Sequence, residues 1–180
     1  MFLTEQFGFF SLSALSAWGF LMAFFFNVFV YSLDVKRRTT LLLSSFIMML
    51  SYMAGDYFFT WISSTAATYF DWVLYDLATV LALLTGYYFI NKTTPSFLYL
   101  VVGLAVNITL FISLYIDVEL NRNSTPWLLW DIYAFGVNFV DYSMIAVLII
   151  DRDIYGLHKL KKSIKSHFRN KKVVNTSNVS

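Results

Sequence analysis

The chain has 180 residues, of which 58% are hydrophobic, 20% are aromatic and only 13% are charged, with a formal net charge of +2 and a mean hydropathy of +0.63. This composition excludes an ordinary soluble domain and is typical of a polytopic membrane protein. The absence of cysteine excludes disulfides, thiolate catalysis and cysteine-ligated metals.

Hydrophobic runs of about 20 residues, the length needed to cross a bilayer, predict five membrane helices. They cover Phe9–Leu33, Thr40–Ser63, Phe70–Ile90, Ser96–Ile116 and Trp127–Ile150. Because the first ten residues lack a basic segment, we expect the first run to remain as a helix rather than to be cleaved as a signal peptide. Pro95 and Pro126 each follow a threonine and suit the first turn of a helix. The sequence therefore predicts an all-α integral membrane protein, in which residues 1–151 form a five-transmembrane-helix bundle.

Basic residues beside the predicted spans indicate the orientation of the chain. The first and third connections and the tail together hold 12 lysine and arginine residues, whereas the opposite side holds only Arg122. We therefore expect the N-terminus outside and the C-terminus inside a plasma or bacterial inner membrane, which requires an odd number of spans. Since the basic residues follow the topology, we expect no nucleic-acid partner.

The tail carries its own pattern. In residues 152–170, apolar positions recur at roughly helical spacing, and basic positions lie between them. This pattern predicts a basic amphipathic helix on the inner leaflet, where anionic lipid would contact Lys159, Lys161, Lys162 and Lys165. A solvated extension of the fifth span is the alternative. Residues 171–180 show no periodicity, and we expect them to be disordered.

Two segments share a sequence pattern. Trp72–Ala78 reads Trp-Val-Leu-Tyr-Asp-Leu-Ala, and Trp127–Ala134 reads Trp-Leu-Leu-Trp-Asp-Ile-Tyr-Ala, 55 positions later. A parallel repeat that relates helices 2-3 to helices 4-5 would produce this spacing. Chance similarity in an aromatic-rich membrane sequence explains it equally well, because the match is poor elsewhere.

Acidic residues interrupt the hydrophobic runs. An ionisable group within the bilayer costs about 2.5 to 3.5 kcal/mol on an insertion scale and is a candidate functional site. At about 1.5 Å of rise per residue, Asp56, Asp76 and Asp131 are expected at similar depth in the outer half of the membrane. Asp141 is expected deeper.

Polar residues extend these acidic positions into helical faces. On the fifth run, the positions Asp131, Ala134, Asn138 and Asp141 are three, four and three residues apart. This spacing predicts that they share one helical face, which is turned away from lipid. Tyr52 and Thr79 share faces with acidic residues of the second and third runs. Asn27 and Asn107 add an amide from each of the two remaining runs. Every predicted helix thus brings a polar group to the interior.

No lysine, arginine or histidine lies within any predicted span. The buried carboxyl groups must therefore be protonated, hydrogen-bonded by neutral groups, hydrated, or neutralised by a cation from outside. We expect transport or conduction of protons or a small cation, with Asp56, Asp76 and Asp131 as the outer binding group. Asn138 and Asp141 would continue the path inward, with Asn27 and Asn107 as neutral ligands, and protons would compete with the cation.

A second hypothesis is a non-transporting immunity, assembly or regulatory protein, whose buried carboxyl groups bind helices of a partner. A homo-oligomer and a partner membrane subunit both remain open. We expect no cofactor: both histidines lie in the tail, which disfavours haem, and the spans lack the lysine that retinal needs. The spans also lack a nucleophile–histidine pair, so we do not expect an enzyme.

One enzymatic alternative rests on two dipeptides. Tyr75-Asp76 and Gly55-Asp56 lie at similar depth on consecutive predicted helices. This pair resembles the motifs of presenilin-type intramembrane aspartyl proteases, whose two carboxyl groups share a proton. The order of the motifs is reversed, Met53 replaces the first glycine, and the Pro-Ala-Leu element is absent. These departures disfavour a protease activity.

Overall fold

The computed structural model describes residues 2–34, 39–62, 69–90, 94–125 and 127–152, and only the backbone of residues 2–13 and 56–62. Within these ranges the chain is helical and contains no strand, as the hydrophobic runs predict. The helices are α1 (Phe2–Ser32), α2 (Thr39–Ile62), α3 (Tyr69–Ile90), α4 (Pro95–Tyr115) and α5 (Leu128–Ile150), and a π-helical turn, η1 (Ile116–Leu120), continues α4.

Four helical segments are long and apolar enough to cross a membrane: Ala14–Ser32, Tyr69–Ile90, Pro95–Leu120 and Leu128–Ile150. In α2 the described apolar segment is shorter, from Thr39 to Gly55. Large apolar side chains such as Trp18, Phe29 and Phe139 are more than half exposed on the outside of the bundle. Such a surface suits a lipid environment, since a water-soluble protein seldom exposes apolar patches of this extent.

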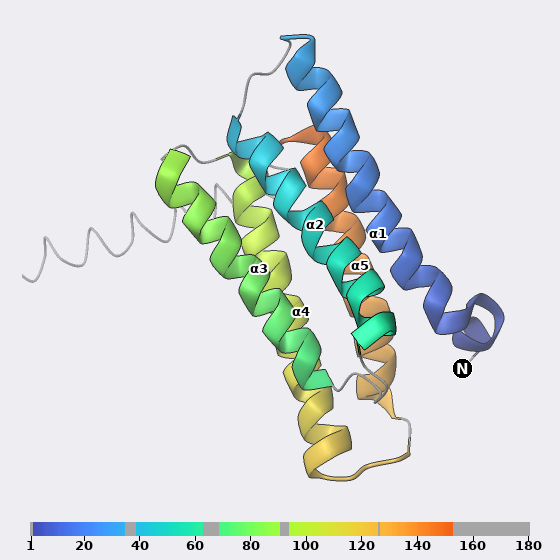
Figure 1. The fold of residues 1–180 in the computed structure, drawn as a ribbon. Coiled ribbons are helices and arrows are strands. Elements are labelled where there is room, and N and C mark those ends of the chain that lie inside the picture. The colour runs from blue at the N-terminus through green and yellow to red at the C-terminus, as the bar shows by residue number, and fades with distance from the viewer. Residues whose placement is uncertain (1, 35–38, 63–68, 91–93, 126, 153–180) are drawn as a thin grey trace, which may run out of the picture.

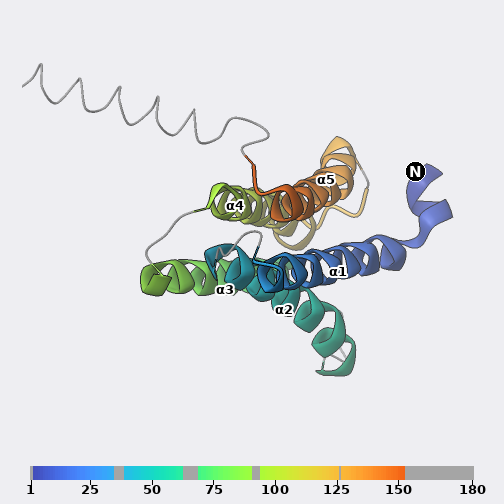
Figure 2. The ribbon, with the colours of Figure 1, turned by 90° about the horizontal axis from the view of Figure 1, so that it is seen from above.

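The helices form a closed ring in which each packs against the next along the chain and α5 packs against α1. Successive helices run in opposite directions, so the α4–α5 connection and the start of the chain lie at one end (Figure 1). We call this end the N-terminal end of the bundle, and the end where α5 finishes the C-terminal end. Viewed from above, α4 and α5 form one layer and α1, α2 and α3 form the other (Figure 2).

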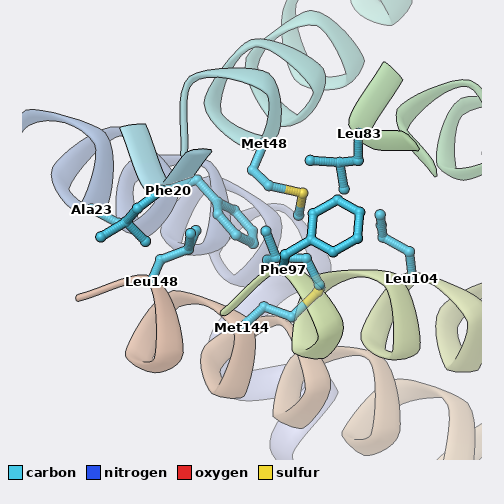
Figure 3. Close-up of a cluster of buried hydrophobic side chains, with 10 residues drawn as sticks. Phe20, Ala23, Met48, Leu83, Phe97, Leu104, Met144 and Leu148 are labelled. Carbon is cyan, nitrogen blue, oxygen red and sulfur yellow. The ribbon is translucent and has the colours of Figure 1, made fainter. Parts of the chain in front are cut away.

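An apolar core fills the part of the bundle toward its C-terminal end. Figure 3 shows Met48, Leu83 and Leu104 around the ring of Phe97, with Met144 beside it. Each of these side chains except Phe97 is at most 2% exposed. Helices α4 and α5 approach closely at Gly103, where an added Cβ would lie 2.5 Å from the sulfur of Met144. Dense packing of this kind leaves little room for water.

The fourth helix departs from its predicted end. The hydropathy pattern predicts a span from Ser96 to Ile116, but the helix continues through η1 to Leu120. Asp117 therefore lies in a helical turn and not in the connection between α4 and α5. Two tryptophan side chains donate hydrogen bonds to its carboxylate there. The prediction for Pro95 is confirmed: it occupies the first turn of α4 after Thr94. Pro126 and the predicted tail helix lie outside the described residues.

Candidate functional site

Asp141 is the centre of a polar layer across the middle of the bundle. The carboxyl group comes from α5 and is 5% exposed. Its Oδ1 accepts a hydrogen bond from the Tyr52 hydroxyl of α2 at 2.6 Å and another from Asn107 Nδ2 of α4 at 2.9 Å. Hydrogen bonds to a buried carboxylate compensate part of its desolvation. Three helices are thus tied together at one oxygen atom.

Asp76 brings a second carboxyl group to this layer from α3. It is 9% exposed and lies close enough to Asp141 for the two groups to interact electrostatically. One turn further along α3, Thr79 donates to the carbonyl of Tyr75 at 2.8 Å and shares a short hydrogen bond with Ser51 of α2. Asp76 itself differs from Asp141, because its Oδ2 has no hydrogen-bond partner among the described residues.

Two further buried polar atoms in the layer lack a partner within the described residues. They are the Asn107 Oδ1 atom, on the same amide that donates to Asp141, and the Oγ atom of Ser16 on α1. Ser16 lies beside Asp141 and is 2% exposed. A buried polar atom without a partner costs about 1 to 3 kcal/mol, and native structures contain few of them. The Ser16 hydroxyl can donate to the carboxylate beside it, so the two acceptor oxygens, Asp76 Oδ2 and Asn107 Oδ1, mark this layer as a candidate binding site.

An apolar layer closes the site toward the C-terminal end of the bundle. On every helix, a buried apolar side chain follows the polar one after a single turn in that direction. The pairs are Ser16 with Phe20, Tyr52 with Met48, Thr79 with Leu83, Asn107 with Leu104, and Asp141 with Met144. Phe20 also packs directly on Tyr52, with ring centroids 4.2 Å apart.

Aromatic rings cover the other side of the site. Tyr133 of α5 contacts Tyr69 of α3 and Phe111 of α4 edge to face, with centroid distances of 6.0 and 5.6 Å. Trp72 stacks on Phe111 at 6.2 Å. We call these four residues the aromatic cover. Among the side chains that the structure describes, the polar layer is thus enclosed between the apolar layer and the aromatic cover.

The structure brings three of the predicted site residues together: Asp76, Asn107 and Asp141 form the polar layer. Two others are buried or half-buried elsewhere. Asn27 donates to the carbonyl of Leu148 at 3.2 Å, near the end of α5, and Asn138 donates to the Ala134 carbonyl of its own helix at 2.6 Å. The side chain of Asp56 and the tail residues Lys159, Lys161, Lys162 and Lys165 lie outside the described residues.

Asp131 is exposed, so the expectation that it shares one interior face with Asp141 is wrong. Ten residues separate the two positions, and at about 100° per residue this separation leaves them roughly 80° apart around the helix axis. Asp131 also lies in the first turn of α5, where the helix dipole favours a carboxylate. The matching Asp76 is buried, so the two similar segments place their aspartates in different surroundings.

Sequence reasoning missed Ser16 and Ser51, because an isolated serine in a hydrophobic run gives no periodic signal. It also missed two anchors at the helix ends. The Asp117 Oδ2 atom accepts hydrogen bonds from the indole N–H groups of Trp127 at 2.8 Å and Trp130 at 3.1 Å. At the other end, the Ser96 hydroxyl donates to the buried carboxylate of Asp151. The first anchor could have been predicted from the sequence, because Asp117 and Trp127 lie only ten residues apart across a short connection.

The fold and the enclosed layer define an all-helical protein that has long apolar helices suited to a membrane and two carboxyl groups in its interior. Comparison with protein-family models, with curated proteins and with solved structures finds no match. Any functional assignment therefore rests on the chemistry of the polar layer.

Proposed function

We propose that the protein is a five-span membrane protein, with its N-terminus outside, that moves protons or a small cation through the polar layer. Asp76 and Asp141 are the ion-binding groups, and Asn107 is a neutral ligand beside them. The basic segment of residues 152–170 would hold the inner end against anionic lipid through its lysines.

The observation that carries the proposal is the set of buried atoms without a partner around Asp141. In an apolar interior, hydrogen-bonding groups without partners are costly, and helix packing alone would select against them. Carboxyl groups used only to join helices would be expected to bond fully across the interface. Asp141 fits that structural role, but Asp76 does not, because its Oδ2 faces no donor.

This asymmetry suggests different roles for the two carboxyl groups. Asp141 is held by Tyr52 and Asn107 and would act as the fixed group of the site. Asp76 has an oxygen left over and would be the group that gains and loses the proton or the cation. An intramembrane ionisable residue that faces the bundle interior commonly marks such a pathway.

The enclosure of the layer fits a closed state of a transport cycle. Ions would reach the site only when the aromatic cover or the apolar layer opens, and carriers that work by alternating access require such closed states. The aromatic cover would be the outer barrier, since it lies toward the N-terminal end, and the packed core would be the inner barrier.

The experiment is a flux measurement on purified protein in liposomes, with an imposed proton or sodium gradient and readouts of internal pH and sodium uptake. We expect flux in the wild type and at least a tenfold loss in Asp141→Asn, a change that removes the charge but keeps the shape. A thermal unfolding curve on the same samples shows whether the variant is folded.

Absence of flux in the wild type under both gradients would refute the proposal. The partner-binding hypothesis would then account for the carboxyl groups. It predicts that Asp141→Asn is tolerated, because the asparagine oxygen can still accept from Tyr52, whereas Asp141→Leu would disrupt binding. The protease alternative stays a hypothesis, because it pairs Asp76 with Asp56, whose side chain lies outside the described residues.

A further inference from the structure

The atoms without partners in the polar layer share one chemical property: all three are oxygens. They are Asp76 Oδ2, Asn107 Oδ1 and Ser16 Oγ, contributed by α3, α4 and α1. Each residue is at least nine-tenths buried, at 9%, 1% and 2% exposure. Asp141 of α5 lies among them, bonded to Asn107 and interacting with the other two residues. Four helices therefore bring buried oxygen atoms to the polar layer.

A bound ion would satisfy these oxygens together. Carboxylate and amide oxygens accept hydrogen bonds, so they cannot satisfy one another without a hydrogen or a cation between them. The Ser16 hydroxyl can donate to the Asp141 carboxylate beside it and still offers a lone pair, whereas Asp76 Oδ2 and Asn107 Oδ1 are both acceptors without a donor among the described residues. Hard cations, in contrast, prefer sites made entirely of carboxylate, carbonyl, hydroxyl and water oxygens.

The site leaves one carboxyl group for a cation, because the Asp141 carboxylate is already held by Tyr52 and Asn107 whereas Asp76 is not, and this favours a monovalent ion. Among the described residues, no three histidine, cysteine, aspartate or glutamate side chains are placed so that together they could hold a metal ion. Two carboxyl groups, with neither a thiolate nor an imidazole ligand nearby, give little basis for selecting a transition metal.

We propose that Ser16, Asp76, Asn107 and Asp141 bind one dehydrated monovalent metal cation of sodium or lithium size. This inference rests on the proposed function, because it names the ion that the same site would carry. The hydroxyl and amide oxygens make the site selective, and the Asp76 carboxylate balances the charge of the cation, while Tyr52 and Asn107 donate to Asp141. Ser51 and Thr79 keep their mutual hydrogen bond and remain outside the ligand set.

The test is thermal unfolding of the purified full-length protein in detergent, followed by tryptophan fluorescence. Sodium, lithium or potassium chloride replaces choline chloride at constant ionic strength and constant alkaline pH. We expect a saturable rise in the unfolding midpoint with sodium or lithium and a smaller rise with potassium, because a cation that binds only the folded state stabilises it.

Two variants remove single ligands. Ser16→Ala and Asn107→Leu should each weaken the apparent sodium affinity by about tenfold or more, since even supporting groups around metal sites contribute that much. Ser32→Ala is the matched control on α1, because it removes an exposed hydroxyl that bonds only to the carbonyl of Val28. Its sodium response should equal that of the wild type.

Equal midpoints in sodium, lithium, potassium and choline would overturn the inference, and so would a sodium effect that Ser16→Ala and Asn107→Leu leave unchanged. Transport and metal-ion binding can be rejected independently of each other. Proton flux without a cation-specific midpoint would leave transport in place and reject the metal ion, whereas sodium binding without any flux would support the site and reject transport.

Discussion

Tyr52→Phe tests whether the hydrogen bonds around Asp141 hold the bundle together. The change deletes only the hydroxyl that donates to the Asp141 carboxylate at 2.6 Å and retains the ring that packs on Phe20. A hydrogen bond to a charged group contributes about 1.5 to 3 kcal/mol. Asn107 continues to donate to the same oxygen, so we expect a loss near the lower limit, about 1.5 kcal/mol in the free energy of unfolding.

Equilibrium unfolding in mixed detergent micelles measures this loss. Tyr88→Phe is the control, because its side chain is 79% exposed and its hydroxyl should contribute little. A double-mutant cycle with Asp141→Asn then isolates the pairwise contribution of the hydrogen bond. If Tyr52→Phe changed stability no more than Tyr88→Phe, or if the cycle showed no coupling, the polar layer would not be assembled as described.

Three other substitutions test the packing and the helix ends. Gly103→Ala places a Cβ 2.5 Å from the sulfur of the buried Met144 and should destabilise the protein by about 1 to 3 kcal/mol. Gly55→Ala is the control in the same unfolding measurement: the nearest atom to its added Cβ lies 3.9 Å away, and we expect no loss of stability. Asp117→Ala should lower the unfolding midpoint and change the tryptophan emission, because two indole N–H groups lose their acceptor; unchanged emission would contradict that anchor. Ser96→Ala should cost about 1.5 kcal/mol by removing the donor to the carboxylate at the end of α5, and a neutral result would show that this bond does not fasten α4 to α5.

Hydropathy was sufficient to predict that the described residues are helical and that four helices are long and apolar enough to cross a membrane, because apolar runs of about 20 residues have few alternatives there. It could not predict the end of α4. Asp117 lowers the local hydropathy and suggests a connection, but the two indole donors compensate its carboxylate and allow the helix to continue as a π-helical turn. Such compensation depends on residues beyond the helix, which a local pattern does not include.

The polar layer was partly predictable. Asp76, Asn107 and Asp141 were identified because acidic and amide groups are rare in hydrophobic runs and must face the interior. The meeting of Tyr52 and Asn107 at one oxygen of Asp141 required the closed ring of helices, which brings α2 and α4 to α5. Ser16 could not be identified, since a serine is common in membrane helices and becomes informative only when its surroundings are known.

The similar segments at Trp72 and Trp127 show why sequence spacing was misleading. Trp72 lies inside α3, which begins at Tyr69, and this places Asp76 seven residues into the helix. Trp127 is the N-cap of α5, so Asp131 lies only three residues beyond the first helical residue. The same local order therefore gives a buried carboxyl group in one helix and an exposed one in the other.

This difference provides the most direct test of the proposed function. Ion flux through liposomes is compared for Asp76→Asn and Asp131→Asn, which make the same chemical change in matching segments. We predict that Asp76→Asn abolishes proton and cation flux in a folded protein, whereas Asp131→Asn retains the wild-type rate. Equal flux in the two variants and in the wild type would contradict the claim that the buried carboxyl groups carry the ion.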